Sequence, residues 1–145
     1  MIGLIQRVKS ASVEVDNQII GSIQQGVLLF LGIQKHDNNL HIEKLAKKVA
    51  NLRIFEDTEH KMNLSIQDTK GGLLVVSQFT LAAETSKGNR PGFSSAAHPK
   101  DAEVLYDAFI THYNNHYGKV QTGQYGANMQ VQLVNDGPAT FILSV

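Results

Sequence analysis

The sequence predicts an α+β fold: a strand-rich, barrel-like single domain with two helices. Strand-like segments outnumber helical ones along the 145 residues. Only two segments have apolar residues at the three- and four-residue spacing of an amphipathic helix. No internal repeat or linker-like tract divides the sequence, so we expect residues 1–145 to form one domain.

Three strands are expected near the start of the chain. Residues 4–15 alternate between apolar and polar side chains, and Asp16–Asn17 supplies a turn before a second strand over residues 18–23. Residues 25–33 form a continuous apolar run that is short enough for a buried strand. The sequence therefore predicts a hairpin followed by a buried strand.

Capping residues and apolar spacing predict the two helices. The first follows residues 37–39, whose side-chain oxygens can cap its N-terminus. Its apolar face contains Ile42, Leu45, Val49 and Leu52, and its other face contains Lys44, Lys47 and Lys48. The second begins at Pro99 and ends near Gly118, a residue suited to the position after a helix. Its expected apolar stripe consists of Leu105, Ala108, Phe109 and His112.

Strands account for most of the remaining sequence. Gly71–Gly72 precedes an apolar, β-branched run that ends near Leu81, and further strands are expected over residues 120–123, 129–134 and 139–145. Between the last two lie Asn135, Asp136, Gly137 and Pro138, all of them turn formers, so a turn is the simpler interpretation. The alternative is that glycine here allows the backbone to approach a ligand closely.

Composition limits the classes of function. Thirteen basic and thirteen acidic residues give zero net charge, which argues against broad nucleic-acid binding but allows contact with the end of an RNA through a local basic patch. The absence of cysteine excludes disulfides and thiolate catalysis. Since the sequence has no apolar run of membrane-spanning length and its first residues do not resemble a secretion signal, we expect a cytoplasmic protein without membrane contact.

Side chains with catalytic chemistry are few. His112 and His116 are four residues apart, but no third metal ligand accompanies them, so we expect no metal. Ser77 and Thr80 lie at the end of a predicted buried strand, where a hydroxyl nucleophile is one interpretation and an ordinary strand end the simpler one. The long polar loop over residues 83–97 carries Lys87, Arg90 and Phe93, which suit either a phosphate-and-base ligand or a solvated loop.

Two of these segments together resemble the paired motifs of the D-aminoacyl-tRNA deacylase family. Residues 77–81 read SQFTL, and residues 135–140 read NDGPAT. Further matching segments are Ile5–Val8, Lys87–Pro91, Tyr125–Ala127 and Met129, so the resemblance covers essentially the whole chain. One departure is Ala139, where many members carry a larger residue such as valine.

The resemblance implies an enzyme that hydrolyses the ester of D-aminoacyl-tRNA, with glycyl-tRNA as a further substrate and without a cofactor. It implies a homodimer in which Gly137–Pro138 is a cis peptide that enters the partner's pocket and rejects L-residues. The implied catalytic residues are Ser77, Gln78, Phe79 and Thr80. The implied substrate-binding residues are Gly137, Pro138, Arg7, Tyr125 and Met129, and the implied RNA-binding residues are Lys87 and Arg90.

Ester hydrolysis requires a nucleophile and donors for the developing oxyanion. Backbone N–H groups around residues 78–80 are the expected donors, and the resemblance implies that the 2′-hydroxyl of the terminal adenosine helps to activate water. The rival interpretation makes Thr80 a covalent nucleophile. Two other classes of protein also stay open: a small-ester hydrolase using Ser77 or Thr80, and a non-catalytic module that binds RNA ends.

Overall fold

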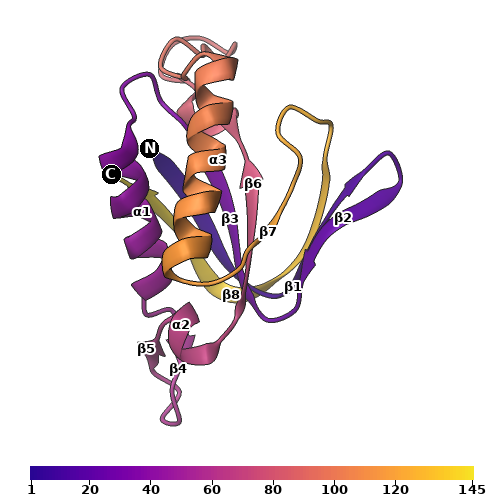
Figure 1. Cartoon of the computed structure of the whole chain (residues 1–145), viewed down its shortest axis with the longest axis vertical. Coiled ribbons are helices and arrows are strands. Elements are labelled where there is room, and N and C mark those ends of the chain that lie inside the picture. Colours follow the sequence, from indigo (N-terminus) through magenta and orange to yellow (C-terminus); the bar gives the residue numbers. More distant parts are fainter.

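The structure, a computed structural model, describes residues 1–145 as a nearly closed strand barrel with helices packed on its outside (Figure 1). The strands are β1 (Ile2–Val15), β2 (Gln18–Ile23), β3 (Gly26–Gly32), β4 (Phe55–Glu56), β5 (Met62–Leu64), β6 (Gly72–Ser77), β7 (Gln121–Thr122) and β8 (Gln130–Ser144). The helices are α1 (Asn39–Asn51), the single turn α2 (Ile66–Thr69), the 3-10 turn η1 (Phe79–Ala82) and α3 (Pro99–His116).

The long strand β1 organises the main sheet. The sheet has the order β2-β1-β3-β6-β7, and β8 pairs antiparallel with β1 along the edge that β2 and β3 leave free. β3 and β6 are parallel, so the chain between them crosses over the sheet through α1 and α2. β4 and β5 form a separate small hairpin at the lower end of the molecule (Figure 1).

The predicted hairpin at the start of the chain is confirmed. Asp16 and Asn17 both have positive φ, 50° and 62°, as a two-residue turn between twisted strands requires. Residues 26–32 form β3 with little exposed surface, in agreement with the buried strand expected there. The sequence pattern thus determined the first three strands.

The sheet curls until its far strands nearly meet. Gly21 of β2 lies so close to β7 that an added Cβ would come within 2.5 Å of the carbonyl oxygen of Thr122. Only glycine allows two backbones to approach this closely. β2 and β7 therefore close most of the barrel, and one mouth of the barrel lies at the end of β6.

Alternating side chains divide the core into two parts. The larger cluster, of 21 buried residues, lies between the sheet and the helices and includes Leu29 of β3 and Val75 of β6. The smaller cluster, of seven buried residues, fills the barrel and includes Leu28 and Leu74 from the same strands. Successive residues of a strand point to opposite faces, so β3 and β6 serve both clusters.

The two predicted helices are present and lie side by side along one side of the sheet (Figure 1). Asn38 caps α1 by accepting a hydrogen bond from the Leu40 N–H at 3.0 Å. Gly118, with a φ of 128°, follows the end of α3 as expected. None of the helices has the length and hydropathy needed to cross a membrane.

The buried face of α3 differs from the predicted stripe, of which only Phe109 is fully buried. The buried residues are Ala102, Tyr106, Phe109 and Tyr113. Tyr106 can be buried because its hydroxyl donates to the Val75 carbonyl at 2.9 Å. Hydropathy ranks tyrosine below leucine. The predicted apolar stripe is therefore one residue out of phase with the face that is buried.

Three further expectations were wrong. The chain has three α-helices rather than two, because α2 is a single turn capped by Ser65 and is too short to show a period. The strand expected to end near Leu81 ends at Ser77, and the next residues form η1. Residues 135–138 form no separate turn, since β8 runs continuously from Gln130 to Ser144.

Candidate functional site at the mouth of the barrel

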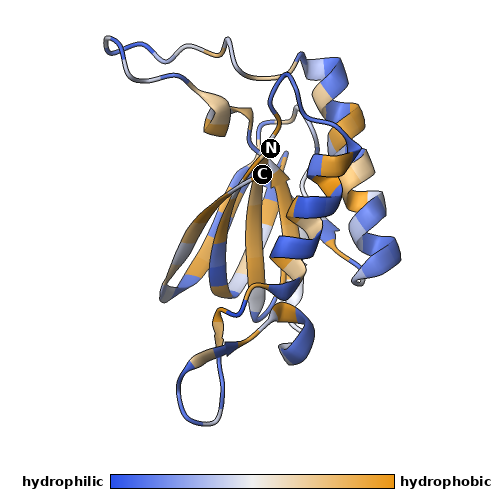
Figure 2. Ribbon diagram, turned by 90° about the vertical axis from the view of Figure 1, so that its left-hand side faces the viewer, coloured by the Kyte–Doolittle hydropathy of each residue, from blue (hydrophilic) through white to orange (hydrophobic).

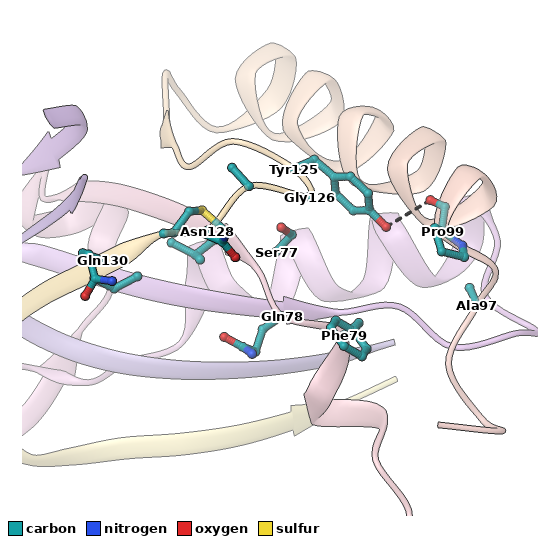
Figure 3. A pocket seen from close by; sticks show the side chains of 13 residues that line it. Ser77, Gln78, Phe79, Ala97, Pro99, Tyr125, Gly126, Asn128 and Gln130 are labelled. Atoms are coloured by element: carbon teal, nitrogen blue, oxygen red, sulfur yellow. Dashed lines mark hydrogen bonds between the residues drawn. The ribbon is translucent and has the colours of Figure 1, made fainter. Parts of the chain in front are cut away.

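The end of β6 borders a cavity of about 700 Å³ at the barrel mouth (Figure 3). One wall consists of residues 76–79, and the other consists of the start of α3 and the segment before β8. Its lining residues are Val76, Ser77, Gln78, Phe79, Ala97, Pro99, Tyr125, Gly126, Ala127, Asn128, Met129, Gln130 and Val131. Five of the residues singled out in the sequence, Ser77, Gln78, Phe79, Tyr125 and Met129, therefore lie around one hollow.

The hydroxyl groups near this wall have no general base beside them. The Gln78 Nε2 donates to the Thr80 Oγ1 at 2.5 Å, and neither Ser77 nor Thr80 is hydrogen-bonded to a histidine or a carboxylate. Thr80 is exposed and does not line the cavity. A nucleophilic hydroxyl needs an adjacent base, so this geometry favours a reaction in which water attacks.

Backbone N–H groups at the start of η1 are free to bind a ligand oxygen. The Gln78 N–H donates to the Leu31 carbonyl at 2.8 Å and is thereby engaged. Phe79 and Thr80 begin η1, and the first N–H groups of a helical turn have no acceptor within it. The donors expected over residues 78–80 are thus reduced to those of Phe79 and Thr80.

Tyr125 fixes the opposite wall. Its hydroxyl donates to the Pro99 carbonyl at 3.0 Å, which ties the segment before β8 to the start of α3 (Figure 3). Its ring centroid lies 5.8 Å from that of Tyr106. Burial, with a smaller contribution from the negative charge of Glu103, raises the pKa of Tyr125, so its hydroxyl stays protonated and the tie persists at neutral pH.

Met129 lies deeper in the mouth. It packs against the barrel cluster, and its sulfur lies so near Gly123 that a Cβ there would come within 2.6 Å of it. The thioether therefore forms part of the floor of the cavity. Because methionine is unbranched and polarizable, this floor can adapt to an aromatic ligand such as a base.

Arg7 lies away from the cavity, beneath an irregular part of β8. Gln6 pairs with Thr140 and Val8 pairs with Asn135, so Arg7 alone lies opposite residues 136–139, which bulge out of the ladder. The side chain of Arg7 is only 4% exposed. Its Nε donates to the Asp136 carbonyl at 3.0 Å, and its Nη1 donates to the Ile54 carbonyl at 2.6 Å.

Further contacts hold the start of this bulge. The Arg7 Nε lies 3.1 Å from the Asp136 carboxylate, and its Nη2 lies 3.9 Å from Glu56. In return, the Asn135 side chain donates to the Arg7 carbonyl at 3.0 Å. Guanidinium and carboxamide together replace the ladder bonds that the bulge interrupts.

Gly137 and Pro138 are exposed at the top of this bulge, and the peptide bond between them is cis. Ala139, the residue at which the sequence departs from the family pattern, is fully buried. Ser77 pairs with Leu31, which pairs with Gly3, four residues along β1 from Arg7. Four strand residues span about 13 Å, so Gly137–Pro138 lies far from the cavity of its own chain.

The loop between η1 and α3 is ordered by backbone pairing of Glu84 with Gly92. Lys87 and Arg90 are exposed within that loop and do not line the cavity. Phe93 contacts Phe79 with ring centroids 5.0 Å apart, and both rings remain partly exposed. The loop thus adds an aromatic pair beside the cavity and basic groups further away.

The two histidines of α3 lie beside each other without a third candidate ligand. The rings of His112 and His116 stack with centroids 4.2 Å apart, and no group of three or more potential ligands exists in the structure. Sequence analysis missed Pro99, Asn128 and Gln130 as lining residues. Asn128 and Gln130 flank Met129, so their place beside a matched motif was the available signal.

The site is a cavity at the mouth of a nearly closed strand barrel, lined by residues of both matched walls. Residues 4–144 match the family described as D-Tyr-tRNA(Tyr) deacylase. The chain is 56% identical over 145 residues to the D-aminoacyl-tRNA deacylase of Cellvibrio japonicus, covering 100% of this chain and 99% of that one. It is 58% identical over 145 residues to the D-aminoacyl-tRNA deacylase of Shewanella frigidimarina, covering 100% of both.

Two solved structures superpose on this chain over nearly its whole length. The c-Myc DNA unwinding element binding protein superposes with a TM-score of 0.95 at 38% identity, covering 100% of this chain and 99% of that one. A probable eukaryotic D-amino acid tRNA deacylase superposes with a TM-score of 0.85 at 14% identity, covering 99% and 98%, and that likeness concerns the fold alone. The chain belongs to the D-Tyr-tRNA(Tyr) deacylase family.

The buried Arg7 generates a stability prediction. Arg7→Ala leaves the Asp136 carboxylate and two carbonyls without their donor, and we expect it to lower the free energy of unfolding by about 3 kcal/mol. Arg53→Ala is the matched control, because Arg53 is exposed and bonds only to Asn63; about 1 kcal/mol or less is expected. Urea unfolding at equal protein concentration measures both, and equal losses would contradict the role assigned to Arg7.

Proposed function

We propose that this protein hydrolyses the ester bond of D-aminoacyl-tRNA, and of glycyl-tRNA, to free tRNA and amino acid. Family membership and relatives named D-aminoacyl-tRNA deacylase support this activity. The observation that carries it to particular residues is the convergence of Ser77–Phe79, Tyr125 and Met129 on one cavity. We place the reaction in the cytoplasm, the compartment that holds aminoacyl-tRNA, and assign it to residues 1–145 as one domain.

In the proposed reaction the 3′-terminal adenosine enters the cavity and the ester carbonyl faces the start of η1. The N–H groups of Phe79 and Thr80 then stabilise the oxyanion. Water is the nucleophile, and the 2′-hydroxyl of the adenosine helps to activate it, which accounts for a site without a side-chain base near Thr80. No cofactor takes part.

Selection against L-residues is assigned to the backbone of Gly137–Pro138. An enzyme that accepts many D-side chains gains nothing from recognising the side chain itself. Main-chain carbonyls can instead bind the α-amino group and exclude a substituent that points the wrong way. Glycine, which has no Cβ, then passes the same test, so glycyl-tRNA is accepted.

The selector must come from a second copy of the chain. Gly137–Pro138 is exposed and lies about 13 Å along the strands from the cavity wall at Ser77 of its own chain. β8 has one unpaired edge, and Val134 and Ile142 on it are 52% and 70% exposed. An exposed apolar edge strand favours pairing with another chain, so we propose a homodimer in which each bulge enters the partner's cavity.

The test of the proposed activity compares D-tyrosyl-tRNA with L-tyrosyl-tRNA. We expect release of the amino acid from the D-ester alone, measured as loss of radiolabelled ester over time. Release from both esters at equal rates would instead indicate a general esterase using Ser77 or Thr80. Release from neither would indicate a module that only binds RNA ends.

A second prediction concerns the nucleophile. Thr80→Ala should retain activity within about threefold, because Thr80 lies outside the cavity and has no base beside it. D-Tyrosyl-tRNA with a 2′-deoxy terminal adenosine should react about a hundredfold more slowly, the usual size of a general acid–base contribution. An acyl-enzyme trapped on Thr80 and detected by mass spectrometry would reverse the assignment.

A third prediction tests whether Gly137 completes the partner's site. A Cβ at Gly137 meets only the Asn135 side chain of its own chain, at 3.1 Å. Gly137→Ala should therefore fold normally and lose activity at least tenfold, because the added methyl group blocks the approach to the partner's substrate.

Mixed dimers provide the control for that prediction. We expect Phe79→Ala, which changes the cavity wall, to be inactive by itself. Mixing and refolding it with Gly137→Ala should give heterodimers with one intact site, restoring about a quarter of wild-type activity. Unchanged inactivity of the mixture would place Gly137 and the cavity in the same chain's site.

A further inference from the structure

The charged residues of this chain are sorted between its two long helices. α1 carries Lys44, Lys47 and Lys48 against Glu43, a net charge of +2, whereas α3 carries Lys100 against Asp101, Glu103 and Asp107, a net charge of −2. The three α1 lysines are exposed and none forms a salt bridge. Zero net charge thus conceals one basic helix and, packed beside it, one acidic helix.

The surface of the molecule around the basic helix α1 contains two hollows. Lys44, Lys47 and Lys48 border a depression of about 470 Å³ whose floor includes Leu52 and Val145. A second hollow of about 530 Å³ adjoins it at Val145 and is bordered by Lys35, His36 and His41. Asp37 also lines it, and its carboxylate is paired with the amino group of Met1 at 2.5 Å. Figure 2 looks onto this side of the molecule, where α1 lies in front of the sheet close to both termini.

The two hollows lie next to the candidate active site. The second hollow is also lined by Ser94 and Ser95, and the cavity at the barrel mouth is lined by Ala97 of the same segment. That segment is fixed to the end of β3, since the Lys35 N–H donates to the Ser95 carbonyl and the Ala97 N–H donates to the Ile33 carbonyl, both at 3.1 Å. An RNA strand that leaves the cavity therefore crosses the segment 94–97 before it reaches Lys35.

We propose that the acceptor arm of the substrate tRNA leaves the cavity across residues 94–97 and lies with its phosphates along Lys35, Lys44, Lys47 and Lys48. We call this surface the α1 track. α3 carries Asp101, Glu103 and Asp107, which oppose a polyanion along that helix, so the charge pattern favours the path along α1 over the path along α3. The inference rests on the proposed function, because it takes tRNA as the ligand.

The chemistry of the α1 track suits contact with the phosphate backbone of an RNA rather than recognition of its base sequence. Lysine ammonium groups contact phosphates as point charges and do not read base edges. Lys44 and Lys48, four residues apart on one helix face, project about 6 Å apart along the axis. Such contacts hold any tRNA equally well and become weaker with salt.

The test compares Lys44→Gln/Lys48→Gln with the matched control Lys70→Gln/Lys119→Gln. Both double variants remove two exposed charges outside salt bridges, and the control positions border a different hollow near the end of α3. The probes are uncharged full-length tRNA and a CCA trinucleotide, with binding measured by fluorescence anisotropy at several salt concentrations. Uncharged tRNA makes the result independent of ester hydrolysis.

The α1 variant should bind full-length tRNA about tenfold more weakly at 0.1 M salt, with the slope of log affinity against log salt reduced by about two. The control should match the wild type, and both variants should bind CCA as the wild type does, because three nucleotides end before α1. Equal binding of tRNA by the two variants, or an equal loss with CCA, would overturn the α1 track. If the wild type bound tRNA through these lysines without hydrolysing D-aminoacyl-tRNA, the proposed function alone would fail.

Discussion

The buried guanidinium of Arg7 is the interaction on which the shape of the site depends. A charge that is 4% exposed is costly unless every donor finds a partner, and here the partners come from Asp136, Ile54 and Glu56. These groups belong to two segments, β8 and the chain around β4, so satisfying one side chain of β1 fixes the bulge of β8 against β1 and against the chain that leads into β4. The bulge can then carry Gly137–Pro138 outward, exposed, without losing its place in the barrel. A purely apolar core residue at position 7 would pack but would not orient a main chain.

The bulge and the cavity are thereby separated by the length of a strand. Along β1, Arg7 lies at one level and Gly3, beside the strands that end in Ser77, at another. Within one chain the two motifs that match the family therefore lie apart, and the proposed function treats them as two half-sites. A rigid β-ladder cannot bring them together, because its residue spacing is fixed at about 3.3 Å. Dimerisation is in this view a geometric requirement of the proposed reaction, and the same distance that divides the motifs in one chain sets the offset at which two chains must meet.

The sequence determined the local features and missed those that depend on distant partners. Asp16–Asn17 and Asn38 were readable because a turn or a cap is satisfied within a few residues. The continuity of β8 was not readable, since Asn-Asp-Gly-Pro has the chemistry of a turn and only Arg7, 129 residues from Asp136, keeps it in the strand. The buried face of α3 was misplaced for a similar reason: Tyr106 is buried because of the Val75 carbonyl, which no helical period reveals. The resemblance named part of the cavity lining and implied that Gly137–Pro138 acts in a partner's pocket, and the fold adds the distance between that motif and the cavity of its own chain.

Zero net charge in a protein that acts on RNA becomes intelligible once charge is considered by surface. At physiological salt an exposed charge acts over about 8 Å, so a ligand phosphate senses its nearest helix and not the molecular total. A uniformly basic chain would hold tRNA in many orientations, most of them with the 3′ end far from the cavity. Opposite charges on α1 and α3, two helices that lie side by side against the sheet, disfavour orientations in which the RNA follows α3 while leaving the chain neutral. A neutral chain can therefore bind RNA. The acidic residues of α3 repel the phosphates from that helix, which directs the RNA along α1.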